Sequence, residues 1–361
     1  MQILIIALSG IGDALMFTPS ILKLKEDLPD CEIDALVMFK GVKEIYEKLP
    51  LIRKVYYHDF IKSNKLSSLF FVLSLRKKYD VVINVYPSNR IEYNLLSWLT
   101  GAKTRLAVEY LRQDQSNWGS LNTLRIKEDD SLHNVEENIR MCEELTGEKV
   151  LDIPPLQFPI DKSNLEFAGE YFSSNGINEN ELVIGFHAGC SALKNHDKRR
   201  WEPEKFAELG KLFIDKFNAR ILLFGGPEES ELKTGIINGI NSLRAISVNS
   251  LSINNAAAVM MRCNLFITND SSLMHVAAAL KLDIVAIIGP TNKNYISPWQ
   301  TNHKIVSLNL DCSPCFFYSP KPLTCSRTDL KFKCIKELTV NLVFEKAKEF
   351  LETKKVNSLF K

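Results

Sequence analysis

Residues 265–280 (LFITNDSSLMHVAAAL) combine side-chain types that can bind an anion. An apolar, β-prone run comes first and a small-residue helical pattern follows, with Thr268, Asn269, Asp270 and Ser271 supplying turn and N-cap chemistry at the junction. A helix that begins in this way presents backbone N–H groups and the positive end of its dipole to a phosphate or pyrophosphate. His275 lies one turn into the helix and can lean back toward the same end. The alternative interpretation is a capped helix that carries an incidental histidine.

Asp13 is a second candidate for chemistry, because it follows the first apolar run of the chain. Residues 3–7 are continuously apolar, as in a strand buried on both faces, and Gly10-Ile11-Gly12-Asp13 leads from them into a helix. This pattern resembles a dinucleotide-binding turn with Asp34 as the ribose ligand, but the third glycine is absent. The Asp13 carboxylate would also repel a pyrophosphate at that position. Asp13 can instead accept a proton from a hydroxyl nucleophile, or it can simply complement the helix dipole.

The second half of the chain carries further groups suited to a nucleotide. His187 ends an apolar run, and Glu229 follows another one in a glycine-rich turn where its carboxylate can hold a ribose hydroxyl. Lys198 and Arg199 belong to a basic cluster that is either a solvated loop or a group that neutralises a departing diphosphate. Gly289-Pro290-Thr291 opens a loop with room for a flat base.

These residues need a scaffold, and strand-like runs alternate with helical patterns through the chain. Such alternation implies doubly wound parallel sheets, whose ligands bind beyond the carboxyl ends of the strands. A proline-rich stretch at 151–160 predicts a linker. We therefore expect an α/β protein of two Rossmann-like domains that face each other across a cleft. The expected bounds are 1–155 and 156–339, and the second domain includes a cysteine-rich loop at 312–334.

Length and composition agree with this organisation. A chain of 361 residues exceeds the usual size of one core, and 45% hydrophobic with 24% charged residues is typical of a globular protein. A formal net charge of +2 argues against a dedicated nucleic-acid-binding protein. The N-terminus lacks a basic n-region, and no run is long and apolar enough to span a bilayer, so we expect a cytoplasmic protein. Residues 66–78 predict an amphipathic helix on the sheet or, as the alternative, a face for an anionic membrane or a lipid-linked acceptor.

Together, these motifs resemble the ADP-heptose lipopolysaccharide heptosyltransferases, glycosyltransferase family 9. The resemblance covers nearly the whole chain and is carried by GIGDA at 10–14 with Thr18-Pro19, KRRWEP at 198–203, TNDSSLMHVAAAL at 268–280 and Gly289-Pro290-Thr291. It implies a GT-B fold with an acceptor-binding first domain and a nucleotide-sugar-binding second domain. It also implies a last helix, about 340–353, that packs back on the first domain.

The resemblance further implies residue roles. Asp13 corresponds to the general base of the family. The family has a lysine before the tryptophan, and either Lys198 or Arg199 takes its role here. The donor-binding residues that it implies are His187, Glu229, Asp270, Ser271, Ser272 and His275.

The implied reaction is inverting transfer of a heptose, or a related sugar, from a nucleotide-sugar donor such as ADP-heptose to a glycan acceptor such as lipopolysaccharide core. Its partners are the donor and a glycan or lipid-linked acceptor, with peripheral contact at the inner face of the membrane. The chemistry needs no metal, and the chain contains no D-x-D motif. The alternatives are a nucleotide-sugar epimerase, a non-catalytic protein of the same fold that binds nucleotide-sugar or glycan, and an NAD-dependent dehydrogenase.

Four cysteines cluster near the C-terminus with the spacing Cys312-x2-Cys315-x9-Cys325-x8-Cys334. In a cytoplasmic protein this pattern favours a metal site over disulfides. Four thiolates suit a closed, tetrahedral structural site for zinc or iron.

Overall fold

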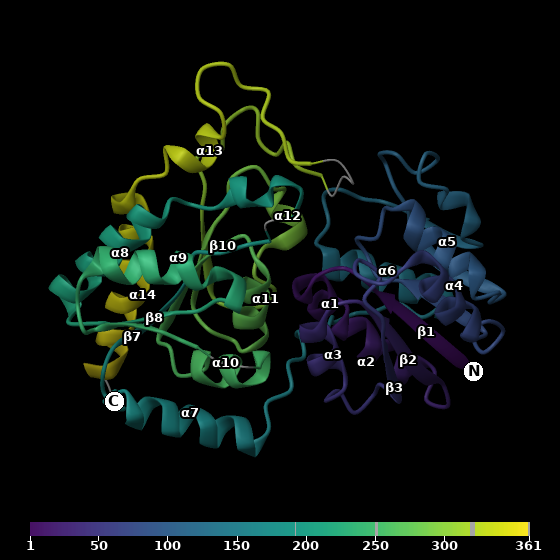
Figure 1. The fold of residues 1–361 in the computed structure, drawn as a ribbon, viewed down its shortest axis with the longest axis horizontal. Helices are drawn as coiled ribbons and strands as arrows, with labels where there is room; N and C mark the ends of the chain where they lie inside the picture. The colour runs from purple at the N-terminus through teal and green to yellow at the C-terminus, as the bar shows by residue number, and fades with distance from the viewer. Residues whose placement is uncertain (192, 250–251, 318–321, 360–361) are drawn as a thin grey trace. The chain divides into compact units, whose positions relative to one another are not determined.

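The structure is a computed structural model that describes residues 1–191, 193–249, 252–317 and 322–359, without the side chains of 193–194 and 353–359 (Figure 1). The chain divides into two compact units, the first formed by Met1–Pro159 and the second by the described chain from Ile160 onward. Among the described helices, none has both the length and the apolar character that crossing a bilayer requires.

Within the described residues, the first unit contains a parallel sheet of six strands in the order β3-β2-β1-β4-β5-β6. The five apolar residues of β1 after Gln2 are at most 1% exposed, which explains why this strand is a continuous apolar run. The strands are β1 Gln2–Ala7, β2 Glu32–Val37, β3 Lys54–Tyr57, β4 Val81–Asn84, β5 Thr104–Glu109 and β6 Leu124–Lys127. The helices are α1 Ile11–Met16, α2 Thr18–Asp27, α3 Lys40–Tyr46, α4 Lys65–Ser74, α5 Ile91–Leu99 and α6 Asn134–Thr146, with a short 3₁₀ helix at Gly119–Leu121.

The second unit repeats the plan, with six described strands in the order β12-β11-β10-β7-β8-β9. The strands are β7 Val183–His187, β8 Arg220–Leu223, β9 Ala245–Ser247, β10 Leu265–Asn269, β11 Ile284–Ile287 and β12 His303–Val306. The helices are α7 Lys162–Ser174, α8 Pro203–Phe217, α9 Ser230–Ile240, α10 Ile253–Met260, α11 Ser272–Ala279, α12 Lys293–Ile296, α13 Lys333–Lys336 and α14 Val340–Leu359, with 3₁₀ helices η2 Leu193–Arg199 and η3 Pro227–Glu229.

Both sheets have the same doubly wound order, in which the winding reverses between two central strands. These strands are β1 and β4 in the first unit and β7 and β10 in the second. Ligands of such sheets bind outside the carboxyl ends of the strands at this reversal. Asp13 follows β1, while Asp270 follows β10, so the fold places both beside a reversal point. The predicted class, two doubly wound Rossmann-like α/β domains, is confirmed.

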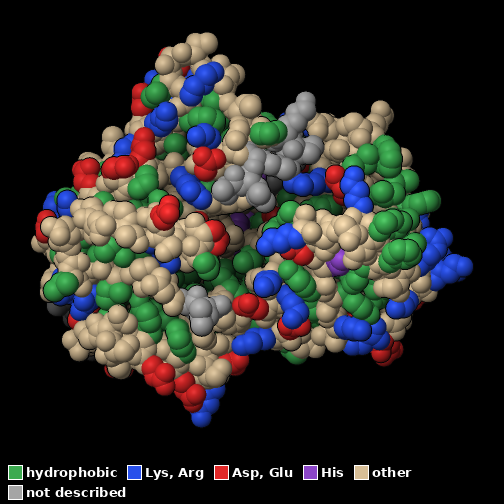
Figure 2. All heavy atoms as spheres, in the orientation of Figure 1, with side chains coloured by type: hydrophobic (Ala, Val, Ile, Leu, Met, Phe, Trp, Pro, Cys, Tyr) green, Lys and Arg blue, Asp and Glu red, His purple; other side chains and the backbone are tan. Residues whose placement is uncertain are grey.

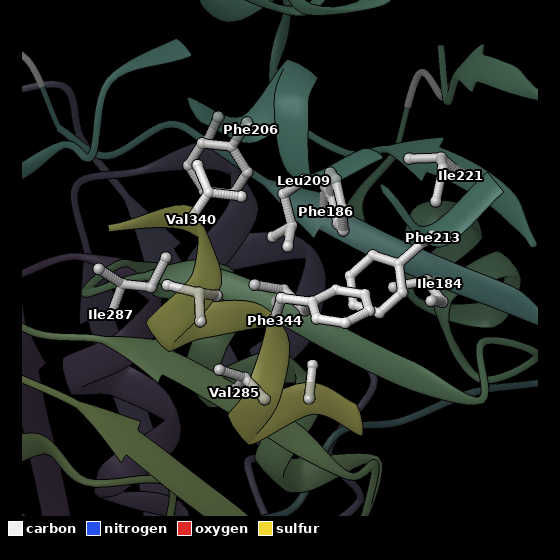
Figure 3. Close-up of a cluster of buried hydrophobic side chains, with 14 of the residues drawn as sticks. Ile184, Phe186, Phe206, Leu209, Phe213, Ile221, Val285, Ile287, Val340 and Phe344 are labelled. Carbon is white, nitrogen blue, oxygen red and sulfur yellow. The ribbon is translucent and has the colours of Figure 1, made fainter. Parts of the chain in front are cut away.

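Helix α14 packs in the core of the second unit; the expected contact of the last helix with the first domain stays a prediction. Its apolar face includes Val343, Phe344 and Ala347, all at most 2% exposed within the core cluster formed by α8 and the strands of the second sheet. The centroid of the Phe344 ring lies 5.1 Å from that of the Phe213 ring on α8. Figure 3 shows both residues within this cluster. Apolar residues at helical spacing account for this position, because the second sheet offers them a complementary apolar face.

Candidate functional site

A chain of buried hydrogen bonds crosses the carboxyl ends of β7 and β10. His187 is the last residue of β7, and its Nδ1 lies 2.8 Å from Oγ of Ser271, just after β10. The other ring nitrogen, Nε2, lies 3.0 Å from Oε2 of Glu229 at the end of η3. All three residues are at most 7% exposed. Three of the residues predicted to bind the donor therefore form one connected group.

The carboxylate of Glu229 is held in a tight cradle. A Cβ atom on Gly189 would lie 1.6 Å from Oε1, and one on Gly225, whose φ is +150°, would lie 2.5 Å from Oε2. Burial alone would raise the pKa of Glu229, but its hydrogen bond to His187, the charges of His187 and Arg200 and the N–H of Gly226 lower it. Glu229 is therefore an ionised acceptor of fixed position, as a ligand for a ribose hydroxyl requires.

The N-terminus of α11 keeps its first-turn N–H groups free of a side-chain cap. Ser271 is the N-cap residue with extended backbone, but its hydroxyl makes no cap bond. Its Oγ instead contacts His187 and, at 3.1 Å, Oγ1 of Thr268. Ser272, the first residue of the helix, is exposed. This end of α11 can therefore accept an anion.

His275 lies in the second turn of α11 and is 4% exposed. Its Nδ1 is buried and has no hydrogen-bond partner among the described residues. Burial lowers the pKa of His275 to about 4, although the charge of Asp270 acts in the opposite direction. His275 is therefore a neutral imidazole at pH 7, and a ligand at the helix end would supply the missing partner.

A buried ion pair distinguishes Arg199 from Lys198. Nη1 of Arg199 lies 2.5 Å from Oδ2 of Asp270, and the two side chains are 11% and 7% exposed. The same Asp270 oxygen accepts a hydrogen bond of 2.6 Å from Oγ1 of Thr291. Lys198 points elsewhere: its side chain is 53% exposed, and its ammonium lies 3.4 Å from Asp197. The structure brings Arg199 to the end of β10 and leaves Lys198 at the surface.

Two residues outside the predicted site residues position this group. The Asn269 side chain accepts a hydrogen bond from the backbone N–H of Trp201 and donates one to the carbonyl of Ala188, which ties the end of β10 to two loops. The ring of Phe316 lies 5.3 Å from the guanidinium of Arg199, in cation–π contact. Asn269 directly precedes the predicted ligand Asp270, and this place in the sequence could have indicated its role. No pattern in the sequence connects Phe316 to Arg199.

Asp13 lies in α1 and is partly buried. Its surroundings include two tyrosines whose hydroxyls donate to backbone carbonyls, Tyr46 to Ala14 and Tyr93 to Leu8. Burial and then the charge of Asp13 raise the pKa of Tyr46, so this phenol stays neutral. At the end of β1, the first unit therefore places the Asp13 carboxylate near the neutral hydroxyls of Tyr46 and Tyr93.

The four C-terminal cysteines are free thiols. Burial and the charges of the other three raise the pKa of Cys334 to about 11, so the four thiols lie within electrostatic range of each other. No group of three or more His, Cys, Asp or Glu side chains in the described part of the chain has the arrangement of a metal site. The loop itself contacts the donor-side residues, because the backbone N–H groups of Cys315 and Phe316 donate to the carbonyl of Pro290, next to Thr291.

Three comparisons bear on these arrangements. The family model described as glycosyltransferase family 9 (heptosyltransferase) matches residues 71–323. A lipooligosaccharide heptosyltransferase 2 from Campylobacter jejuni is 28% identical over 359 residues, which cover 98% of this chain and 99% of the relative.

Solved structures are also similar. A glycosyl transferase family 9 structure from Veillonella parvula is 26% identical with a TM-score of 0.71, covering 84% of this chain and 85% of that chain. The E. coli ADP-heptose lipopolysaccharide heptosyltransferase II is 20% identical with a TM-score of 0.75, covering 98% of this chain and 100% of that one. The similarity to the E. coli structure, at 20% identity, shows a shared fold.

Proposed function

The chain belongs to glycosyltransferase family 9, the heptosyltransferase family, and we propose that it transfers a heptose from ADP-heptose to the core of a lipopolysaccharide or lipooligosaccharide. The observation that carries this proposal is the connected group of Glu229, His187 and Ser271 at the N-terminus of α11, with the Arg199–Asp270 pair beside it. That group offers a carboxylate for a ribose and N–H groups and a cation for a diphosphate.

In the proposed reaction, the leaving diphosphate is bound by the first-turn N–H groups of α11, including those of Ser271 and Ser272, and by Arg199. Preorganised donors of this kind stabilise the negative charge that develops as the glycosidic bond breaks. Asp270 orients Arg199 and Thr291 at this end of the sheet. Lys198, with its side chain half in solvent, contributes long-range charge only.

Asp13 is the proposed general base. It takes the proton of an acceptor hydroxyl, and that oxygen attacks the anomeric carbon from the face opposite the nucleotide, which inverts the configuration. We propose a lipid-linked acceptor, and hence an enzyme that works in the cytoplasm at the inner face of the membrane in peripheral contact with it. Helix N–H groups and Arg199 supply the electrostatic stabilisation, so the chemistry has no required cofactor.

Donor binding is tested by calorimetric titration of the purified protein with ADP, UDP, GDP and NAD. ADP is expected to bind most tightly without added metal. Replacing His275 with alanine is expected to weaken ADP binding about tenfold or more, because the charged ligand loses its contact with the imidazole. The control is His303→Ala, since His303 lies on β12 and bonds only the carbonyl of Thr301 in the described structure. Preference for UDP or GDP would contradict the proposed donor, and unchanged affinity in His275→Ala would exclude His275 as a ligand.

We also propose that Cys312, Cys315, Cys325 and Cys334 bind one structural zinc or iron ion. The chemistry of the donor set supports this, because cysteine thiolates are the ligands that structural zinc and iron sites use. Its role would be to fold the loop that carries Phe316 to Arg199.

Metal analysis of the reduced, purified protein is expected to find one zinc or iron ion per chain. The double variant Cys312→Ala/Cys315→Ala is expected to lose the ion and to melt at a lower temperature, since a structural metal contributes folding energy. Cys31→Ala, which removes a thiol from the other unit, should keep it. A metal-free wild type, or a double variant with undiminished metal, would contradict the site.

A further inference from the structure

Helix α4 presents an apolar face to solvent. Leu66, Leu69, Phe70 and Leu73 are spaced i, i+3, i+4 and i+7, so they lie along one side of the helix, and they are 67%, 39%, 69% and 37% exposed. The opposite side carries Val72, which is 3% exposed and belongs to the core cluster of the first unit. The helix is therefore apolar on both sides, while only one side packs on the sheet. A contiguous apolar surface of this kind usually marks an interaction site.

The charged side chains within the segment that carries this face all have one sign, and Asp59 and Asp80 border the segment. Residues 60–79 contain five Lys or Arg and no Asp or Glu. All five are exposed: Lys62, Lys65, Arg76, Lys77 and Lys78. They flank both ends of the helix, two before or at its start and three after its end. Figure 2 shows hydrophobic side chains gathered over α4 and α5, with Lys and Arg side chains at their border.

The neighbouring helix α5 ends beside the end of α4 and carries an exposed tryptophan there. Nη1 of Arg76 donates to the carbonyl of Leu99 at 3.2 Å, so the end of α4 lies beside the end of α5. Trp98, one residue earlier on α5, is 47% exposed. A tryptophan next to an apolar face and basic residues is typical of protein segments at a membrane–water interface.

We propose that the α4 face, defined as Leu66, Leu69, Phe70 and Leu73 with the five flanking basic residues, docks on the surface of an anionic phospholipid bilayer. This inference rests on the peripheral membrane contact of the proposed function and identifies its surface. The apolar side chains enter the headgroup region, and the ammonium and guanidinium groups contact lipid phosphates. A second copy of the chain fits less well, because a two-fold symmetric contact would bring the same five positive charges together.

Vesicle flotation of the full chain tests the proposal. The wild type is expected to float with vesicles of phosphatidylcholine and phosphatidylglycerol, and to float less with phosphatidylcholine alone or at high salt. Leu66→Ser/Phe70→Ser is expected to lower the partition coefficient about tenfold or more, since it removes the two most exposed apolar groups of the face. Lys62→Glu/Lys65→Glu is expected to lower it to a similar extent on anionic vesicles only.

Matched controls exclude general surface effects. Leu243→Ser changes an apolar residue that is 95% exposed in the other unit, and Lys162→Glu changes a lysine whose side chain is 91% exposed there. Both should bind vesicles as the wild type does. Equal binding by Leu66→Ser/Phe70→Ser and the wild type, or a wild-type dimer in light scattering that this variant dissociates, would overturn the proposal. Failure of heptose transfer with vesicle binding intact would count against the proposed function alone.

Discussion

Asp13→Asn is expected to lower the turnover number of heptose transfer about a thousandfold, within the range that a general base contributes. Asparagine has almost the same shape as aspartate but cannot take a proton from the acceptor hydroxyl. Tyr46 and Tyr93 do not replace it, because burial keeps the pKa of each phenol above its usual value even without the charge of Asp13. Steady-state kinetics with ADP-heptose and acceptor measures the turnover number, and ADP titration measures the nucleotide affinity of the variant.

The matched control for this variant is Asp30→Asn, which changes an exposed aspartate in a turn of the same unit. It should leave turnover and ADP affinity unchanged. ADP affinity should also be unchanged in Asp13→Asn, since the proposed nucleotide ligands all belong to the second unit. Turnover of Asp13→Asn within a few fold of the wild type would exclude Asp13 as the base.

Arg199→Met is expected to lower turnover by a factor of about 100 to 1,000, whereas Lys198→Met should stay within about twofold of the wild type. The difference follows from geometry: Arg199 is held by Asp270 at the end of β10, while the Lys198 side chain lies half in solvent. Kinetics of the two variants under the same conditions is the measurement. Equal losses, or a larger loss in Lys198→Met, would assign the role to Lys198.

Loss of activity in Arg199→Met has to be separated from loss of folding. Removing Arg199 leaves the buried Asp270 carboxylate without its cation, which costs about 3–5 kcal/mol in similar buried pairs. The double variant Arg199→Met/Asp270→Asn removes that unpaired charge and should recover most of the melting temperature. It should nevertheless remain as inactive as the single variant, and recovery of turnover in the double variant would show that Arg199 has only a structural role.

The sequence was sufficient to predict the central strands and the order of the units. All residues of β7 and β10, and all residues of β1 after Gln2, are buried, so each strand contains an apolar run that the sequence shows. Of the four edge strands, β3 was predicted at Lys54–Tyr57, while β6, β9 and β12 were not, because their partly exposed residues give no clear apolar pattern. β5, which pairs with β6, has two half-buried residues at its start and was also missed.

Individual side-chain directions at the site were harder to predict. The grouping of His187 with Ser271 follows from their places at the ends of β7 and β10, which pair in the sheet. The choice between Lys198 and Arg199 does not follow from the sequence, because neighbouring residues of η2 point in different directions. The contact of Phe316 with Arg199 joins residues from a loop and a 3₁₀ helix far apart in the chain, and no local pattern specifies it.

One measurement tests the central claim most directly: incubation of the purified protein with ADP-heptose and a heptose-deficient, lipid-linked core acceptor, followed by mass spectrometry of the glycan and quantification of ADP. We expect the wild type to add one heptose and release one ADP for each acceptor, with Asp13→Asn forming almost no product. If ADP binds to the wild type but no heptose reaches the acceptor, the proposed donor and acceptor are contradicted. If Asp13→Asn forms product at the wild-type rate, the proposed mechanism is contradicted.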